Sequence, residues 1–280
     1  MSSEVQQARE TLGARLRELR KDARLTGRAL AHAAGWHPAK VSRLEYGKQA
    51  PSEDDIREWC HRCSADDQAG DLIATIRNIE AAYLEWKQQL RTGLKRKQEA
   101  SYPLYKQARV IRAYEPALIP GLLQTAAYAS AVMGRYIDLL QIPDDREMAV
   151  PARIERQRVL YQGDRRFCFV LEEAALRTLV GSPEVMLGQL DRVLAVMSLP
   201  RVSVGIVPPM REREIWPAEG FLMFDETTVQ VETVSAQLTI TQPREVALYG
   251  QTFDWLQRSA GYGEQARQLI AAAIRDLGAI

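Results

Sequence analysis

Histidine, cysteine and long apolar runs are scarce in this chain of 280 residues, and each shortage excludes a class of protein. Three cysteines are too few for a disulfide framework. The three histidines, His32, His37 and His61, all lie within the first 65 residues, so a serine or cysteine nucleophile in the later domain has no histidine base of its own. The sequence also lacks a glycine-rich phosphate loop and a nucleophile elbow. We therefore expect no enzymatic activity, no cofactor and no metal.

The apolar segments of the chain are too short and too interrupted to cross a membrane. The most apolar stretch, residues 117–133, contains Pro120, Gly121 and Gln124, and the first seven residues lack the apolar core of a signal peptide. Hydrophobic residues make up 46% of the chain and charged residues 26%, which is typical of a globular protein. A chain of this length is too long for one small helical unit, so we expect two domains in a cytoplasmic protein.

A few residues are of types that bind metals or catalyse reactions, but their spacing does not favour either role. Cys60 and Cys63 lie one helical turn apart, but a structural zinc needs four ligands, and His61 points to another face of the helix. The adjacent carboxylates Glu172 and Glu173 could serve as acid and base, yet neighbouring side chains on a strand or helix start point apart. We interpret all five as structural residues.

The segment 25–47, LTGRALAHAAGWHPAKVSRLEYG, is the most informative part of the sequence. Apolar residues at helical spacing predict a short helix before Gly35 and a second helix from about Pro38 to Tyr46. Gly35 suits a left-handed corner, and His37 is placed to cap the second helix, since Pro38 has no amide hydrogen to lose at its first position. Gly47 ends that helix. The pattern predicts a helix-turn-helix.

The second helix of this motif is expected to enter the major groove of DNA. Val41 and Leu44 form its packing side, which leaves the opposite side to reach base edges. Arg43 is our first choice for base readout because its guanidinium can donate two hydrogen bonds to guanine, while Lys40 can reach a guanine or a phosphate and Ala39 a thymine methyl. An ordinary helix pair with a solvated charged face is the alternative. The expected DNA-contacting residues are Thr26, Arg28, His37, Pro38, Ala39, Lys40, Ser42, Arg43, Tyr46 and Lys48.

The residues around the motif favour the DNA-binding interpretation. Leu12, Leu16 and Leu19 predict a helix beneath it, and a further helix follows that buries Ile56 and Trp59. Ten lysines and arginines stand against four acidic residues between positions 9 and 48, although the whole chain carries a net charge of only +1. A compact helical domain with this excess has the electrostatic footprint of a phosphate-binding surface.

From about Leu12 to Trp59 the chain resembles the Xre family of helix-turn-helix regulators, whose fold is lambda-repressor-like. The resemblance implies binding to operator DNA, and it implies that Glu45 holds its neighbours by a salt bridge or hydrogen bond instead of touching bases. The family often has a phosphate-gripping glutamine where this chain has Gly27, so Thr26, Arg28 and the helix amides would take over that contact. The resemblance is carried by Leu25, Leu30, Ala31, Gly35, Val41, Ser42, Arg43, Leu44, Glu45 and Gly47.

The remaining sequence predicts a mixed domain behind a helical connection. Residues 69–100 are predicted as one long helix, which Tyr102-Pro103-Leu104-Tyr105 ends. Helical spacing recurs in residues 184–197, 243–259 and 264–277. We expect a helix-turn-helix domain in 1–68, a connecting helix and linker in 69–108, and an α+β domain with a small, mostly antiparallel sheet in 109–280. Strands are predicted over Phe167–Leu171, Val202–Val207, Phe221–Phe224, Val229–Val234 and Leu238–Ile240.

The segment Pro120-Gly121-Leu122-Leu123-Gln124-Thr125, followed by Tyr128-Ala129, is similar to the C-terminal domain of Scr1-type, antitoxin-like bacterial regulators. The similarity extends from about residue 80 to residue 277 and includes the segments 153–157, 169–177 and 219–221. It implies a small partner protein encoded nearby, and it supplies no molecular activity for the domain.

Together these features predict a sequence-specific, DNA-binding transcriptional regulator. One small helical unit buries too little surface for selective binding, so we expect a homodimer on pseudo-palindromic operators. Two alternatives stay open: an antitoxin-like module whose main ligand is the small partner protein, and a regulator that senses a small-molecule effector. For the second, an apolar pocket could be lined by Tyr114, Trp216, Phe221, Phe224 and Trp255, although core packing explains these aromatics equally well.

Overall fold

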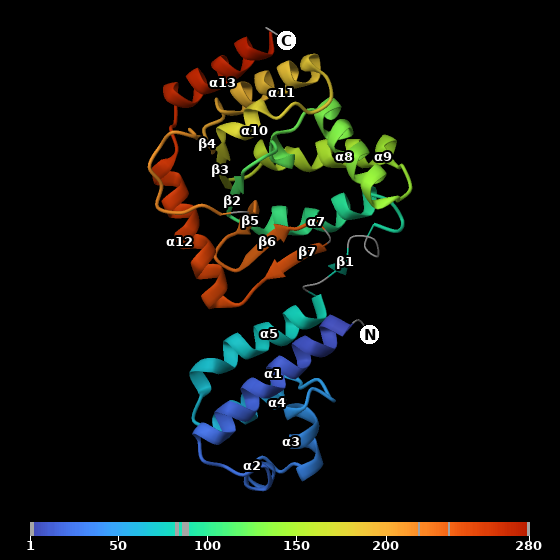
Figure 1. The fold of residues 1–280 in the computed structure, drawn as a ribbon, viewed down its shortest axis with the longest axis vertical. Helices are drawn as coiled ribbons and strands as arrows, with labels where there is room; N and C mark the ends of the chain where they lie inside the picture. Colours follow the sequence, from blue (N-terminus) through green and yellow to red (C-terminus); the bar gives the residue numbers. More distant parts are fainter. Residues whose placement is uncertain (1–2, 82–83, 86–89, 218, 235, 279–280) are drawn as a thin grey trace. The chain divides into compact units, whose positions relative to one another are not determined.

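The computed structural model describes residues 3–81, 84–85, 90–217, 219–234 and 236–278 (Figure 1). The chain divides into two compact units: Met1–Tyr83 with Thr239–Val246, and Leu84–Leu238 with Ala247–Ile280. Among the described residues, none of the helices combines the length and the apolar character that a membrane crossing requires.

The first unit is a small helical domain built on the apolar stripes that the sequence predicts. The side chains of Leu16, Ile56 and Trp59 are almost fully buried, and the Trp59 indole Nε1 donates a hydrogen bond to the carbonyl of Leu16 at 3.0 Å. Its helices are α1 (Ser3–Asp22), α2 (Gly27–Ala33), α3 (Pro38–Glu45), α4 (Glu53–Arg62) and α5 (Ala69–Ala81). Helix α5 adds Leu72, Ile73 and Ile76 to the same core.

Helix α1 crosses the end of α3 at very short range, and Gly13 makes this approach possible. A Cβ atom at Gly13 would lie 2.5 Å from the carbonyl oxygen of Leu44, too close for any real side chain. The absence of a side chain at Gly13 therefore allows α1 to lie this close to the last turn of α3.

The prediction of one long helix over 69–100 is wrong. Helix α5 ends at Ala81, the residues Leu84–Glu85 form strand β1, and helix α7 spans Lys95–Gln107 with Pro103 inside it; the parts of the prediction at 82–83 and 86–89 lie outside the described residues. Gly93 has a φ of +97°, which no continuous helix allows. The carboxylate of Asp145 then accepts from the amides of Leu94 and Lys95, both at 2.8 Å, and so starts a new helix.

The second unit is an α+β domain, as predicted. The strands predicted over Val202–Val207 and Phe221–Phe224 and the helices predicted over 243–259 and 264–277 are present with these bounds. The further strands are β2 (Val110–Glu115), β3 (Arg166–Glu172), β4 (Val202–Val207), β5 (Phe221–Phe224), β6 (Thr228–Glu232) and β7 (Ala236–Ile240). The helices are α8 (Ala126–Leu140), α9 (Arg146–Arg156), α10 (Glu173–Arg177), α11 (Pro183–Val196), α12 (Pro243–Ser259) and α13 (Glu264–Leu277), with 3₁₀ turns η2 (Gly121–Leu123) and η3 (Gln157–Leu160).

The sheet is mixed, which corrects the expectation of a mostly antiparallel sheet. Its strand order is β1-β7-β6-β5-β2-β3-β4, and β3 pairs in parallel with both β2 and β4. Strand β5 is antiparallel to β2 and β6, with a hairpin at Asp225, where φ is +52°. Helices α8 and α9 connect β2 to β3, and helices α10 and α11 connect β3 to β4. Helical crossovers of this kind join parallel strands.

Helices cover both faces of this sheet. On one face, buried residues of α8, α11 and α13 form a single apolar cluster with alternate residues of β2, β3 and β4, and α11 and α13 lie side by side (Figure 1). On the other face, Phe221 of β5 packs edge-on against Tyr249 and Phe253 of α12, at 5.0 and 6.3 Å between ring centroids. Cover on both faces is typical of sheets that contain parallel strands, because the crossover helices pack on the sheet.

Candidate nucleic-acid interface

The turn between α2 and α3 has the geometry that its sequence predicts. The Thr26 hydroxyl accepts the amide of Ala29 at 3.1 Å and so caps the start of α2. Gly35 has a φ of +67°, and the amide of Trp36 donates back to the carbonyl of Ala31 at 2.7 Å. The chain thus leaves α2 through a left-handed corner and enters α3 within four residues.

Helix α3 begins at Pro38, as predicted, and ends at Glu45, one residue before the predicted end at Tyr46, which is its C-cap. The His37 ring nitrogen Nδ1 accepts the amide of Ala39 at 3.2 Å, with Pro38 in the first turn. After the helix, Gly47 has a φ of +64°, and the amide of Lys48 donates to the carbonyl of Arg43 at 2.9 Å. A short, capped helix with a defined orientation is the element that a major groove can accept.

One side of α3 is anchored in the domain core. Val41 and Leu44 are buried, and Glu45 is only 9% exposed. The carboxylate of Glu45 faces the guanidinium of Arg20 on α1, with Nε–Oε1 at 2.5 Å and Nη2–Oε2 at 3.2 Å. This hydrogen bond raises the pKa of Arg20, so the guanidinium stays charged. Glu45 has the holding role that the Xre resemblance implies.

The opposite side of α3 presents Ser42 and Arg43 to solvent, as predicted. The Nε of Arg43 donates to the Gln49 side-chain oxygen at 2.9 Å. This contact directs the guanidinium while the side chain as a whole stays exposed. Gln49 did not stand out in the sequence, because nothing in its neighbourhood shows that the chain folds back beside Arg43.

Lys40 differs from the expectation that it faces outward. Its ammonium lies 2.5 Å from the Asp55 carboxylate on α4 and 4.5 Å from the centre of the Trp36 ring, and its side chain is 26% exposed. Asp55 also accepts the amide of Ser52 in the capping box of α4. A contact between Lys40 and DNA must therefore compete with an existing ion pair, which makes Arg43 the stronger candidate for base readout. The acidic first turn of α4 was visible in the sequence, but its proximity to Lys40 was not.

The remaining predicted contact residues surround α3. Ala39 is half-buried, and Tyr46 is 52% exposed, with the Arg17 guanidinium 5.5 Å from its ring centre. Exposed residues from the prediction are Thr26, Arg28, His37, Pro38, Ser42, Arg43, Tyr46 and Lys48. The structure thus brings these eight residues to the surface in and around α2 and α3.

The cysteines of the Cys60-His61-Arg62-Cys63 segment belong to the core. Both thiols are buried, and burial raises the pKa of Cys60 to about 11, so it is protonated at neutral pH. The exposed His61 lies 3.5 Å from Asp66. Within the described part of the chain, no group of three metal-binding side chains is clustered.

The aromatic residues considered for an apolar pocket are not gathered around one. Tyr114 and Phe224 are buried in the core, Trp216 is 73% exposed, and Phe221 packs against α12.

The adjacent carboxylates Glu172 and Glu173 have different partners. Glu172 accepts two hydrogen bonds from Arg213, whereas Glu173 forms an ion pair with Arg177 of its own helix.

Comparison with known proteins identifies both parts of the chain. Residues 11–72 match the family model described as a helix-turn-helix domain, and residues 102–272 match the model described as a domain of unknown function (DUF5753). The comparison with curated proteins finds no match. Among solved structures, the archaeal chromatin protein TrmBL2, whose structure shows a novel mode of DNA binding, is 14% identical over 81% of this chain and 71% of its own, with a TM-score of 0.33.

Proposed function

The chain belongs to the DUF5753 family and carries a helix-turn-helix domain ahead of that family's domain, and from this premise we propose that it is a sequence-specific, DNA-binding transcriptional regulator. Helix α3 is its recognition helix and Arg43 its main base-reading residue. The protein acts in the cytoplasm and without catalysis. Its N-terminal domain is of the Xre type, and its C-terminal domain is of the Scr1 type.

The observation that carries this proposal is the two-sided construction of α3. One side is fixed to α1 and the core through Val41, Leu44 and the Glu45–Arg20 pair, while the other side exposes Arg43. A readout helix needs both properties, because its position must be rigid for its side chains to meet base edges in register. The excess of basic residues between positions 9 and 48 supplies the attraction to phosphates.

We propose that two copies bind together on a pseudo-palindromic operator. A single domain of this size offers one short helix to the groove, which gives little discrimination against the many competing sites of a genome. Two copies with a two-fold axis place their α3 helices about one helical turn of DNA apart and so double the number of specific contacts. The second domain is the part of the chain that holds the copies together.

Replacing Arg43 with alanine tests the base-reading role. We expect specific binding to weaken by about 1–3 kcal/mol per bound copy, since a bidentate contact to a base edge is lost, while binding to random DNA changes little. Fluorescence anisotropy with a selected site and a shuffled duplex measures both affinities.

The matched control is Arg62→Ala, which removes the same charge from an exposed position at the end of α4, where Arg62 pairs with Glu58. This variant is expected to keep the wild-type preference for the selected site. Equal losses on the selected and shuffled duplexes after Arg43→Ala would show that Arg43 contacts only phosphates.

A further inference from the structure

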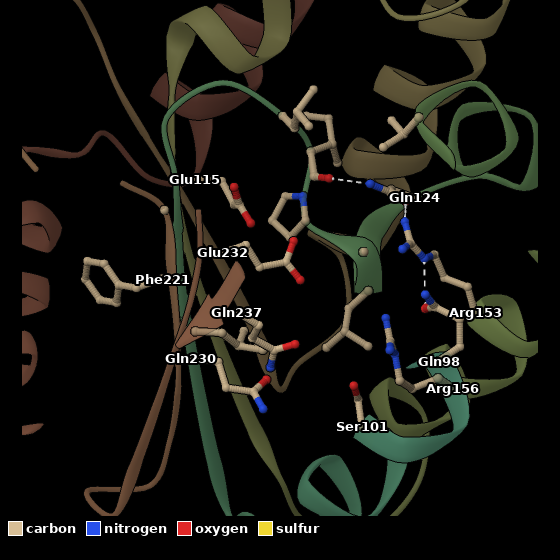
Figure 2. Close-up of a pocket in the computed structure, with 18 of the residues that line it drawn as sticks. Gln98, Ser101, Glu115, Gln124, Arg153, Arg156, Phe221, Gln230, Glu232 and Gln237 are labelled. Carbon is tan, nitrogen blue, oxygen red and sulfur yellow. Dashed lines mark hydrogen bonds between the residues drawn. The ribbon is translucent and has the colours of Figure 1, made fainter. Parts of the chain in front are cut away.

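The second unit contains a cavity of about 230 Å³ between helices α7, α8 and α9, the turn at residues 116–122 and strands of the sheet (Figure 2). This volume is ample for a small metabolite, because one water needs only about 10–15 Å³ on the same measure. Figure 2 shows Arg153 and Arg156 on the helix side of the cavity and Glu115 and Glu232 on the sheet side. The wall thus mixes charged and apolar side chains, and Phe221 is its one residue from the aromatic set that the sequence suggested for a pocket.

Arg156 is a buried cation on the cavity wall with a nitrogen atom that the described part of the chain leaves unpaired. Its side chain is 7% exposed, and its Nε is buried with no hydrogen-bond partner among the described residues. The guanidinium stacks over the ring of Tyr105, 4.9 Å from its centre. Gly121 leaves it uncovered, since a Cβ there would lie 3.2 Å from Nη2. A buried cation without an acceptor is costly, and a bound anion removes that cost.

Arg153 lies one helical turn away and is held in place by neutral groups. Its Nε donates to the Gln98 side-chain oxygen at 3.1 Å and its Nη1 to the Gln124 side-chain oxygen at 2.6 Å, while Gln124 is itself fixed by the carbonyl of Ile119 at 2.7 Å. Amide oxygens orient the guanidinium without neutralising it. Burial and the neighbouring charge of Arg156 lower the pKa of Arg153 to about 10, which leaves it charged at neutral pH.

The carboxylates on the opposite wall do not balance these charges. Glu232 pairs with Lys97, with Nζ–Oε1 at 2.7 Å. Burial, helped by the charge of Glu232, raises the pKa of Glu115 to about 8, so Glu115 is largely protonated at neutral pH. The cavity therefore holds three cationic groups, Lys97, Arg153 and Arg156, against the one ionised carboxylate of Glu232, so two positive charges remain in excess.

We propose that this cavity binds a small anionic molecule whose carboxylate or phosphate group is held by Arg156 and Arg153. A guanidinium offers paired donors that match the oxygens of either group, and two of them one turn apart on α9 form a clamp. The side chains of Ser101, Gln230 and Gln237 line the rest of the space and can hydrogen-bond a polar body. This binding site is independent of the DNA-binding proposal.

Calorimetric titration of the full-length protein tests the site, with inorganic phosphate and succinate as separate probes at constant ionic strength. We expect one of the two to bind, and the preferred probe identifies the anionic group. Arg156→Gln should weaken this binding at least tenfold, because it removes the unpaired charge. Gly121→Ala should also weaken it, since the added Cβ presses on Nη2 while both arginines remain.

The matched control is Arg158→Gln, which removes an arginine that is 65% exposed and lies just beyond the end of α9. This variant is expected to bind the probe as the wild type does, and thermal unfolding checks that all three variants fold. The proposal is overturned if neither probe binds, or if Arg156→Gln, while folded, binds as tightly as Arg158→Gln.

Discussion

Replacing Glu45 with alanine is expected to lower the free energy of unfolding of the N-terminal domain by about 3–5 kcal/mol. The carboxylate is 7% exposed and the Arg20 side chain 11% exposed, so the substitution leaves a guanidinium buried without its counter-charge. Arg20 would keep only its hydrogen bond to the carbonyl of Leu25. Because the same pair fixes α3 to α1, the loss should also loosen the recognition helix.

Hydrogen exchange of the amides in α1 to α4 measures this effect, since it reports on the N-terminal domain separately from the rest of the chain. The control is Glu18→Ala, which removes an exposed ion pair between Arg15 and Glu18, with side chains 47% and 62% exposed. That pair should contribute less than about 1 kcal/mol. If the two variants lost the same protection, the buried pair would not hold α3.

The second large effect concerns the salt dependence of DNA binding. Besides Arg43, the exposed cations around the motif include Arg24, Arg28 and Lys48 in each copy. If these three contact phosphates in both copies of a dimer, affinity should fall roughly 10³-fold between 50 and 200 mM salt, because bound counterions are released when phosphates are neutralised. Titrations of a short duplex at four salt concentrations give the slope.

Lys48→Ala tests which residues contribute to that slope. Removing one phosphate contact per copy should reduce the slope by about one for each bound copy, with equal effects on specific and random DNA. Arg62→Ala serves again as the control and should leave the slope unchanged. An affinity that hardly responds to salt would contradict the assignment of this surface to phosphate binding.

The helix-turn-helix could be predicted from sequence because its determinants are local. The cap at His37, the glycines at 35 and 47 and the apolar pair Val41 and Leu44 all act within a few residues of where they stand. The pairing of Lys40 with Asp55 could not be predicted, since it depends on how α4 packs against α3. Local sequence signals therefore predict the helix-turn-helix, whereas tertiary packing decides which cationic side chains of α3 stay free of ion pairs within the domain.

The second domain was predicted less completely, for the same reason. Strand β2 escaped prediction because Arg112 and Glu115 interrupt its apolar pattern, although it occupies the middle of the sheet. Without β2, the helices on either side of β3 could not be identified as crossovers, and the closely spaced strands predicted over residues 221–240 set the expectation for the whole sheet.

The cavity could not be predicted for a related reason: its walls come from many separated parts of the chain. Arg153 and Arg156 look in sequence like the polar face of an amphipathic helix, and only the fold shows that this face turns inward. The one sequence feature that pointed to this region was the segment 120–125, which is similar to the Scr1-type domain. The structure places Gly121 and Gln124 of that segment against the two arginines.

Selection of DNA from a random-sequence pool by the full-length protein tests the central claim most directly. If α3 reads bases in the major groove from two copies of the chain, successive rounds should enrich a two-fold symmetric sequence whose half-sites contain a guanine and lie about 10 base pairs apart. Recovery of a pool as random as the one supplied, with DNA bound equally well whatever its sequence, would contradict the account.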